Sequence, residues 1–327
     1  MPAHTGSGQT LPGCESGQSI CPCKINTPTH SPSLHDTLND SLFVFLQHYL
    51  IPKRALTAAL GKLSDIRGGA LTHAAARAFI AHYGVNMAEA ADPDVEHYST
   101  FNDFFTRALR PGARALAPMA EAPWICPVDG SISQCGAITR DRIFQAKGHD
   151  YSTLALVGGD PALAAQFQDG AFATLYLSPR DYHRIHMPCR GRLTRMIHVP
   201  GDLFSVNPAT ARGIPGLFAR NERVVCVFDS DRGPFVMALV GATIVGSMAT
   251  AWHGIVNPPR PGVLREWRYE RDTVVLERGA EMGRFLLGST VVMLFPRDTL
   301  RFNPSWAPDK AVRLGEAMAT AVGHTPA

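Results

Sequence analysis

The segment at residues 178–188 places two histidines, His183 and His186, three positions apart, between two prolines and beside an acidic residue. An unperturbed imidazole titrates near neutral pH, so this pair favours proton transfer by a general acid or base. A metal site would need further ligands, and the chain has no His-x-x-x-His or Cys-x-x-Cys pair. We therefore expect no metal ion. The alternative is that both histidines are partly exposed turn residues.

Gly288 and Ser289 stand between apolar residues, as though inside a strand. Glycine weakens a strand and often marks a bulge. The Ser289 hydroxyl could fold back on the carbonyl of Gly288, because glycine has no side chain to block the approach and tolerates distorted dihedral angles. Taken alone, a bulge without chemistry is the simpler interpretation.

Asp129 belongs to an Asp-Gly pair after a short apolar run, which by itself is ordinary hairpin-turn chemistry. The sequence contains no complete nucleotide-binding motif. Residues 241–246 have the glycine spacing of a phosphate loop, but Ser247 and Met248 stand where Lys and Ser or Thr are required. The serine-hydrolase pattern Gly-x-Ser-x-Gly is absent as well.

The composition is ordinary for a globular protein: of 327 residues, 45% are apolar and 18% are charged. A net charge of +3 is too small to imply nucleic-acid binding. The longest strongly apolar run, at residues 42–51, is well short of the roughly 20 residues of a spanning helix. Seven cysteines, an odd number, argue against a full disulfide framework and favour a reduced, cytosol-facing protein.

The elements that must position these residues fall into three parts. Residues 1–40 are rich in Ser, Thr, Gly, Pro and Gln, which predicts a disordered leader or a start codon placed too early. From residue 41 to about 82, apolar residues recur at helical spacing beside basic ones. Such helices could pack on the protein's own core, or lie on an anionic membrane with the apolar face down.

Beyond residue 123, short β-rich runs are bounded by Gly and Pro clusters. The runs lie at residues 172–177, 193–199, 223–228, 235–245, 273–276 and 291–295. No long alternation of strand and helix is present, so a doubly wound parallel sheet is disfavoured. We predict an α+β fold in which a helical region at 41–122 stands on a mostly antiparallel β core at 123–327.

Together these segments resemble the motifs of phosphatidylserine decarboxylases, most of all the bacterial, membrane-associated enzymes. The pattern Gly-x-Glu-x-Gly-x-Phe-x-x-Gly-Ser-Thr at residues 279–290 is similar to the family's self-cleavage motif. Further matches follow in order at residues 98–107, 129–130, 146–149, 176–188, 201–207, 218–223 and 240–246. One departure is Arg278, where the family more often has Lys. The resemblance runs from about residue 41 to about residue 295.

The resemblance implies a pyruvoyl enzyme that makes its own cofactor. Ser289 would attack the carbonyl of Gly288, with His186 as general base and Asp129 orienting the imidazole. β-Elimination and loss of ammonia would leave a covalent pyruvoyl group at position 289, which separates a β chain (1–288) from an α chain (289–327). This group would form a Schiff base with phosphatidylserine and accept the electrons that CO2 leaves behind, with His183 as the proton donor that completes phosphatidylethanolamine.

The resemblance also implies a membrane partner. Phosphatidylserine stays in the bilayer, so the helical region would dock on the anionic surface at the cytoplasmic face of the cell membrane, as a peripheral protein without a spanning helix. The α and β chains would stay together, because the cut falls inside the β core. A homodimer of αβ pairs is expected, and no nucleic-acid partner.

Three alternatives stay open. A soluble pyruvoyl decarboxylase for a small amino acid or a different headgroup would process itself identically, but its turnover would not depend on lipid or detergent micelles. A processed but inactive membrane-binding module would split and form no product. A serine hydrolase using Asp129, His186 and Ser289 on external esters would stay a single chain.

Overall fold

The computed structural model describes residues 61–146, 148–243, 247–257, 262–271, 273–286 and 289–322. Within them the chain has an α+β fold with mostly antiparallel sheets, which confirms the predicted fold class. The predicted leader, most of the first helical pattern and Gly288 lie outside the described residues. None of the helices in these segments is long and apolar enough to cross a bilayer.

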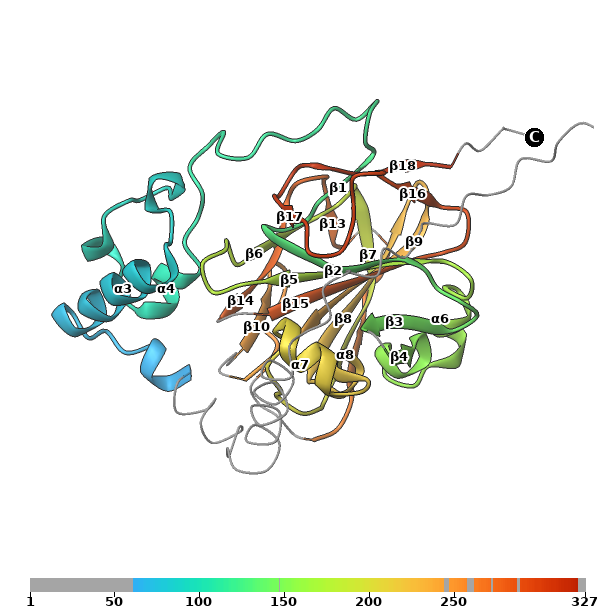
Figure 1. The fold of residues 1–327 in the computed structure, drawn as a ribbon, viewed down its shortest axis with the longest axis horizontal. Helices are drawn as coiled ribbons and strands as arrows, with labels where there is room; N and C mark the ends of the chain where they lie inside the picture. Colours follow the sequence, from blue (N-terminus) through green and yellow to red (C-terminus); the bar gives the residue numbers. More distant parts are fainter. Residues whose placement is uncertain are drawn as a thin grey trace, which may run out of the picture. The chain divides into compact units, whose positions relative to one another are not determined.

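The first described elements are helical and pack around phenylalanine rings. They are α3 (Ala70–Tyr83), η1 (Met87–Glu89), η2 (Val95–His97) and α4 (Phe101–Phe105). Helix α3 ends at Gly84, whose φ of 68° is the left-handed conformation that glycine adopts readily. Helix α4 begins with a capping box between Thr100 and Asp103. The two helices lie side by side in Figure 1. Between them, the ring of Phe79 meets that of Phe104 edge-on.

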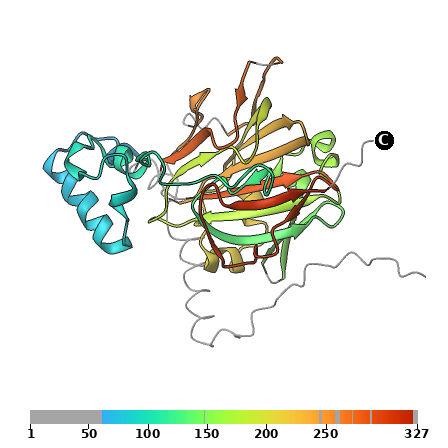
Figure 2. The ribbon, with the colours of Figure 1, turned by 90° about the horizontal axis from the view of Figure 1, so that it is seen from above.

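The core is a nine-stranded antiparallel sheet with the order β12-β7-β8-β9-β15-β5-β2-β17, to which β13 is added by pairing with β7. The strands are β2 (Gly130–Ala137), β5 (Ala171–Leu177), β7 (Gly191–Val199), β8 (Arg223–Ser230), β9 (Gly233–Val240), β12 (Arg265–Arg268), β13 (Val275–Leu276), β15 (Ser289–Phe295) and β17 (Ala311–Val312). All seven residues of β15 are buried, and Figure 2 shows this strand among its neighbours from above.

Three smaller sheets and four short helices complete the described part of the chain. The sheets have the orders β1-β18-β16, β11-β10-β14-β6 and β3-β4. Their strands are β1 (Trp124–Ile125), β3 (Arg142–Ala146), β4 (His149–Ser152), β6 (Arg184–His186), β10 (Ser247–Thr250), β11 (Gly254–Ile255), β14 (Glu281–Leu286), β16 (Leu300–Phe302) and β18 (Ala317–Ala321). The helices are α5 (Thr153–Leu156), α6 (Pro161–Ala165), α7 (Pro208–Gly213) and α8 (Leu217–Arg220).

The chain changes sheets between β14 and β15. Strand β14 pairs with β10 and β6 in the four-stranded sheet, whereas β15 pairs with β9 and β5 in the nine-stranded sheet. Only residues 287 and 288 separate the two strands. The predicted cleavage point therefore falls in the sequence where the chain passes from one sheet to the other, and β14 pairs with the strand β6 that carries His186.

Most of the predicted β runs are strands, including 172–177 and 291–295 within β5 and β15. Two runs are only partly strands: β13 covers only Val275–Leu276 of the run 273–276, and β9 ends at Val240 within the run 235–245. The next residue, Gly241, donates its backbone N–H to the Glu222 carbonyl at 2.9 Å, and the chain leaves the sheet there.

Candidate active site

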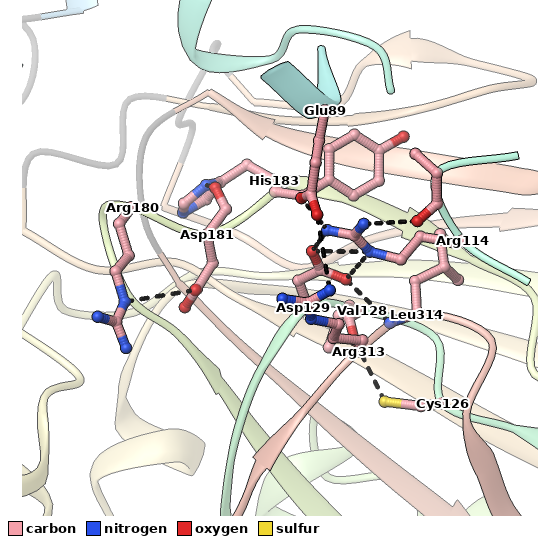
Figure 3. Close-up of polar contacts among 12 residues, drawn as sticks. Glu89, Arg114, Cys126, Val128, Asp129, Arg180, Asp181, His183, Arg313 and Leu314 are labelled. Carbon is pink, nitrogen blue, oxygen red and sulfur yellow. Dashed lines mark hydrogen bonds and ion pairs between the residues drawn. The ribbon is translucent and has the colours of Figure 1, made fainter. Parts of the chain in front are cut away.

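Asp129 lies between β1 and β2, and Arg114 holds its carboxylate (Figure 3). Arg114 Nε donates to Oδ1 at 3.0 Å, and Nη2 donates to Oδ2 at 2.5 Å. The backbone N–H of Leu314 also donates to Oδ1, at 2.9 Å. Neither side chain of the pair is more than 10% exposed, so this charge-assisted contact is largely shielded from water.

Arg114 also reaches Glu89 at the end of η1, where Nη2 donates to Oε2 at 2.7 Å. This hydrogen bond lowers the pKa of Glu89, so the carboxylate is ionised at neutral pH. The hydrogen bond to Asp129 in turn raises the pKa of Arg114. A chain of charged groups therefore connects the helical elements to Asp129.

His186 ends β6, and both of its ring nitrogens have partners. Nδ1 donates to the Gly279 carbonyl at 2.8 Å, because a carbonyl oxygen can only accept. Burial lowers the pKa of His186, so the ring is neutral at pH 7. Nε2 then carries a lone pair and accepts from the Tyr182 hydroxyl at 3.0 Å. This tautomer presents Nε2 as a base.

His183 immediately precedes β6 and is fully buried. Its Nδ1 donates to the Asp181 carbonyl at 2.8 Å, while Nε2 has no hydrogen-bond partner in the structure. The ring packs on Phe105 of α4, with the ring centroids 4.1 Å apart. Burial lowers the pKa of His183 to about 3, because the imidazolium would lose its hydration. The resting ring is therefore neutral, with a free lone pair on Nε2.

Ser289 opens β15 opposite Leu177 of β5. It is 1% exposed, and its hydroxyl has no hydrogen-bond partner among the described residues. A buried hydroxyl without a partner costs about 1–3 kcal/mol, so its retention asks for a functional reason. The carbonyl of His183 accepts from the N–H of Phe285, which precedes Ser289 by four residues in the sequence.

Backbone pairing brings Asp129 and His186 into one region, since the N–H of His186 donates to the carbonyl of Pro127 at 2.9 Å. Their side chains, however, have other partners. The carboxylate pairs with Arg114, and Nδ1 donates to Gly279. Within the described residues no hydrogen bond joins Asp129 to His186, or either histidine to the serine hydroxyl. The self-cleavage triad stays a prediction, and forming it requires an exchange of partners.

Sequence reasoning did not single out Arg114, Glu89 or Tyr182. Arg114 is 15 residues from Asp129 and 25 from Glu89, and no helical or strand period relates them, so no spacing rule pairs these charges. Tyr182 was within reach, because it stands inside the histidine segment at residues 178–188.

Comparison with known proteins adds an independent line of observation. The family model described as "Phosphatidylserine decarboxylase" matches residues 101–320, and one described as "PSD" matches residues 42–84. A relative from Azoarcus sp. (strain BH72), named "Phosphatidylserine decarboxylase proenzyme", is 68% identical over 88% of this chain and 99% of its own length. Relatives of the same name from Methylibium petroleiphilum and Dechloromonas aromatica are 69% and 66% identical, over 87% and 86% of this chain and 99% and 98% of their own lengths.

Proposed function

The chain belongs to the phosphatidylserine decarboxylase family, and from this premise we propose that it converts phosphatidylserine to phosphatidylethanolamine and CO2. It is a decarboxylase, a lyase of lipid metabolism, and it is made as a proenzyme that processes itself. The observation that carries the proposal is the buried Ser289, whose hydroxyl lacks a partner at the transition between two sheets.

We assign self-cleavage to Ser289, His186 and Asp129. Nε2 of neutral His186 takes the hydroxyl proton as Oγ bonds to the carbonyl carbon of Gly288, and the peptide nitrogen leaves with a proton, which gives an ester. Asp129 stabilises the imidazolium once it has exchanged Arg114 for the ring. Loss of the Cα proton of residue 289 then expels the Gly288 carboxylate. Water finally replaces the nitrogen, ammonia leaves, and a pyruvoyl group remains at the new N-terminus.

The residues present fit this pyruvoyl cofactor. Serine is the residue type from which it forms, and the Ser289 hydroxyl has no structural hydrogen bond that would be lost. Backbone pairing with Leu177 holds residue 289 at the head of β15, away from solvent. Once formed, the ketone supplies an acceptor for the substrate amine and for the electron pair that CO2 leaves behind.

His183 is our proposed proton donor for decarboxylation. Replacement of CO2 by hydrogen consumes one proton, and the resting ring has none on Nε2, because burial lowers the pKa of His183 to about 3. A negative charge brought beside a buried imidazole raises its pKa. Binding of the anionic substrate would therefore load Nε2 with the proton that His183 donates.

The helical elements would bring the site to the membrane surface. Leu63, Ile66 and Leu71 are 60%, 53% and 78% exposed, with the basic residues Lys62 and Arg67 beside them in the sequence. Exposed apolar side chains flanked by basic ones are typical of segments that lie at a bilayer interface. The resemblance further supports a location at the cytoplasmic face of the cell membrane and a homodimer of αβ pairs.

The intact mass of the purified protein tests self-processing. Cleavage before Ser289 divides the 35.4 kDa chain of 327 residues into pieces of 288 and 39 residues, in proportion about 31 and about 4 kDa. The smaller piece should be lighter than its sequence by one ammonia. Ser289→Ala should remain one chain without activity, because neither attack nor elimination can occur. Two chains from this variant would refute the cleavage mechanism.

Product formation tests the substrate. The processed protein should release phosphatidylethanolamine from phosphatidylserine in detergent micelles or vesicles. Equal turnover of free serine, without lipid or detergent, would show instead a soluble amino-acid decarboxylase.

A further inference from the structure

Arg107, two residues after α4, is a buried cation that forms no ion pair with any of the described residues. It is 4% exposed, and its Nε and Nη1 have no hydrogen-bond partner in the structure. Nη2 donates to the Arg180 carbonyl at 3.4 Å, which is beyond the usual range for such bonds. The Phe104 ring centroid lies 5.6 Å from the guanidinium carbon.

The nearby carboxylates are engaged elsewhere. Asp181 Oδ2 accepts from the N–H and the hydroxyl of Ser178, and Asp129 is held by Arg114. Burial lowers the pKa of Arg107, although a guanidinium stays protonated in proteins. A buried charge without a partner is strongly destabilising. Among the described residues Arg107 thus has no direct ion pair, and Asp129 and Asp181 act on its charge only through space.

Arg107 borders the reacting residues. The carbonyl that it contacts belongs to the turn at residues 178–183, between β5 and β6. This turn begins directly after the residue that pairs with Ser289 and ends at His183. On the other side, Phe105 of α4 packs against the His183 ring. The unpaired guanidinium therefore lies where the helical elements meet the site.

We propose that Arg107 binds the phosphodiester of the substrate headgroup, an inference that rests on the proposed function. The guanidinium N–H groups form a planar fork that matches two oxygens of one phosphate. In phosphatidylserine the phosphodiester lies between the acyl chains and the serine. Arg107 has a corresponding set of contacts: the Phe104 ring of α4, on the proposed membrane side, and the Arg180 carbonyl in the turn that ends at His183.

The serine carboxylate is the other anion of this headgroup, and the chemistry disfavours it as the partner. It leaves as neutral CO2, so an ion pair with it would stabilise the substrate more than the transition state and slow the reaction. A phosphodiester keeps its charge throughout. Arg107 would then stabilise both states equally, and its loss should raise KM with kcat nearly unchanged.

Arg107→Met tests the inference, because methionine removes the charge and the donors but fills much of the space. We expect the variant to split into the same two chains and to melt at the same or a higher temperature. Its KM for phosphatidylserine in detergent micelles should rise about 10- to 100-fold. Arg107→Lys should recover part of the loss. Arg192→Met is the matched control, since Arg192 pairs with Asp229 on the main sheet, and its KM should not change.

A non-reacting lipid separates anion binding from turnover. Dihexanoylphosphatidylcholine has the phosphodiester but neither a primary amine nor a carboxylate. It should inhibit the wild type competitively and protect it against heat, and Arg107→Met should need at least about tenfold more of it. N-acetylserine has the carboxylate without the phosphate and should affect both proteins equally.

The outcomes distinguish the two proposals. Unchanged KM and unchanged inhibition in Arg107→Met would overturn the phosphodiester site and leave the decarboxylase intact. A lower melting temperature or a failure to split would instead make Arg107 a structural or maturation residue, which also overturns the inference. If instead N-acetylserine inhibited the wild type much more strongly than Arg107→Met, the partner of Arg107 would be the substrate carboxylate. A processed wild type that forms no phosphatidylethanolamine would overturn the proposed function itself.

Discussion

Two backbone carbonyls determine where the protons of His183 and His186 lie. Each carbonyl accepts from Nδ1, so each neutral ring presents Nε2 as a base. The rings differ in what occupies that atom: Tyr182 donates to Nε2 of His186, whereas Nε2 of His183 is free. This difference in partners is a physical reason to expect different roles for two histidines only three residues apart.

Alanine variants separate these roles. His186→Ala should remain mostly uncleaved, with maturation slowed by about 100-fold or more, because Ser289 loses its base. His183→Ala should mature at least partly and then decarboxylate poorly. Tyr182→Phe should mature no more slowly than wild type, since Nε2 of His186 is then free. Gel electrophoresis of the two chains measures maturation, and an assay of phosphatidylethanolamine measures decarboxylation. If His183→Ala stayed uncleaved while His186→Ala matured but formed little product, the roles of the two histidines would be the reverse of those proposed.

Stability should fall in mild acid. The pKa of His183 is about 3 in the fold, against 6.5 for the ordinary group, so the unfolded chain binds more protons between these values. The free energy of unfolding is therefore unaffected by this group above pH 6.5. As pH falls from 6.5 toward 3, the group lowers the free energy of unfolding by at most about 1.4 kcal/mol per pH unit. Burial lowers the pKa of His186 in the same direction.

Urea denaturation of Ser289→Ala and of its double variant with His183→Gln, between pH 7 and pH 4.5, measures this dependence on an uncleaved chain. The double variant should show a smaller loss. If the free energy of unfolding fell equally with pH in the two proteins, His183 would not be the group responsible.

Among the elements, those whose pattern depends on local periodicity could be predicted. The apolar spacing at residues 71–79 corresponds to α3, and the run 172–177 to β5. Strand β6 has only three residues, too short for an alternating pattern, and was not predicted. The candidate site residues stood out by residue type and local spacing, and their roles followed from the motif resemblance. The Arg114 contact could not be predicted in either way, because it depends on how separate elements fold together.

Gly130 shows how closely two elements meet at the site. It begins β2, directly after Asp129, and an added Cβ would lie 2.3 Å from the Tyr176 carbonyl oxygen of β5. Gly130→Ala should therefore force the strands apart and lower the free energy of unfolding by about 1–3 kcal/mol, with slower maturation. Urea denaturation and the time course of splitting measure both effects. Ser131→Ala, the next residue of β2, is the control, and equal stability of the two variants would contradict the close contact.

At the scale of the whole molecule, the helical elements carry the most exposed large apolar side chain of the described residues. Leu71 is 78% exposed on α3, and Leu63 is 60% exposed. Changing both to Ser should weaken binding to phosphatidylserine-containing vesicles by about tenfold or more, because each buried methylene contributes about 0.8 kcal/mol. Vesicle co-sedimentation measures this. Leu154→Ser on α5 is the control at an exposed leucine of the core, and equal losses from both changes would exclude docking through the helical elements.

The position of Ser289 at the head of β15 also bears on refolding. Strand β15 lies between β9 and β5, so cleavage would turn an internal strand into the start of a separate short polypeptide, held only by its neighbours. The precursor folds with this strand tethered to the rest of the chain. After processing, denaturation would release the short chain, which could return to its place between β9 and β5 only through a bimolecular association. The mature enzyme should therefore be unable to refold by the route that its precursor followed. Its lifetime should be determined by how slowly it unfolds.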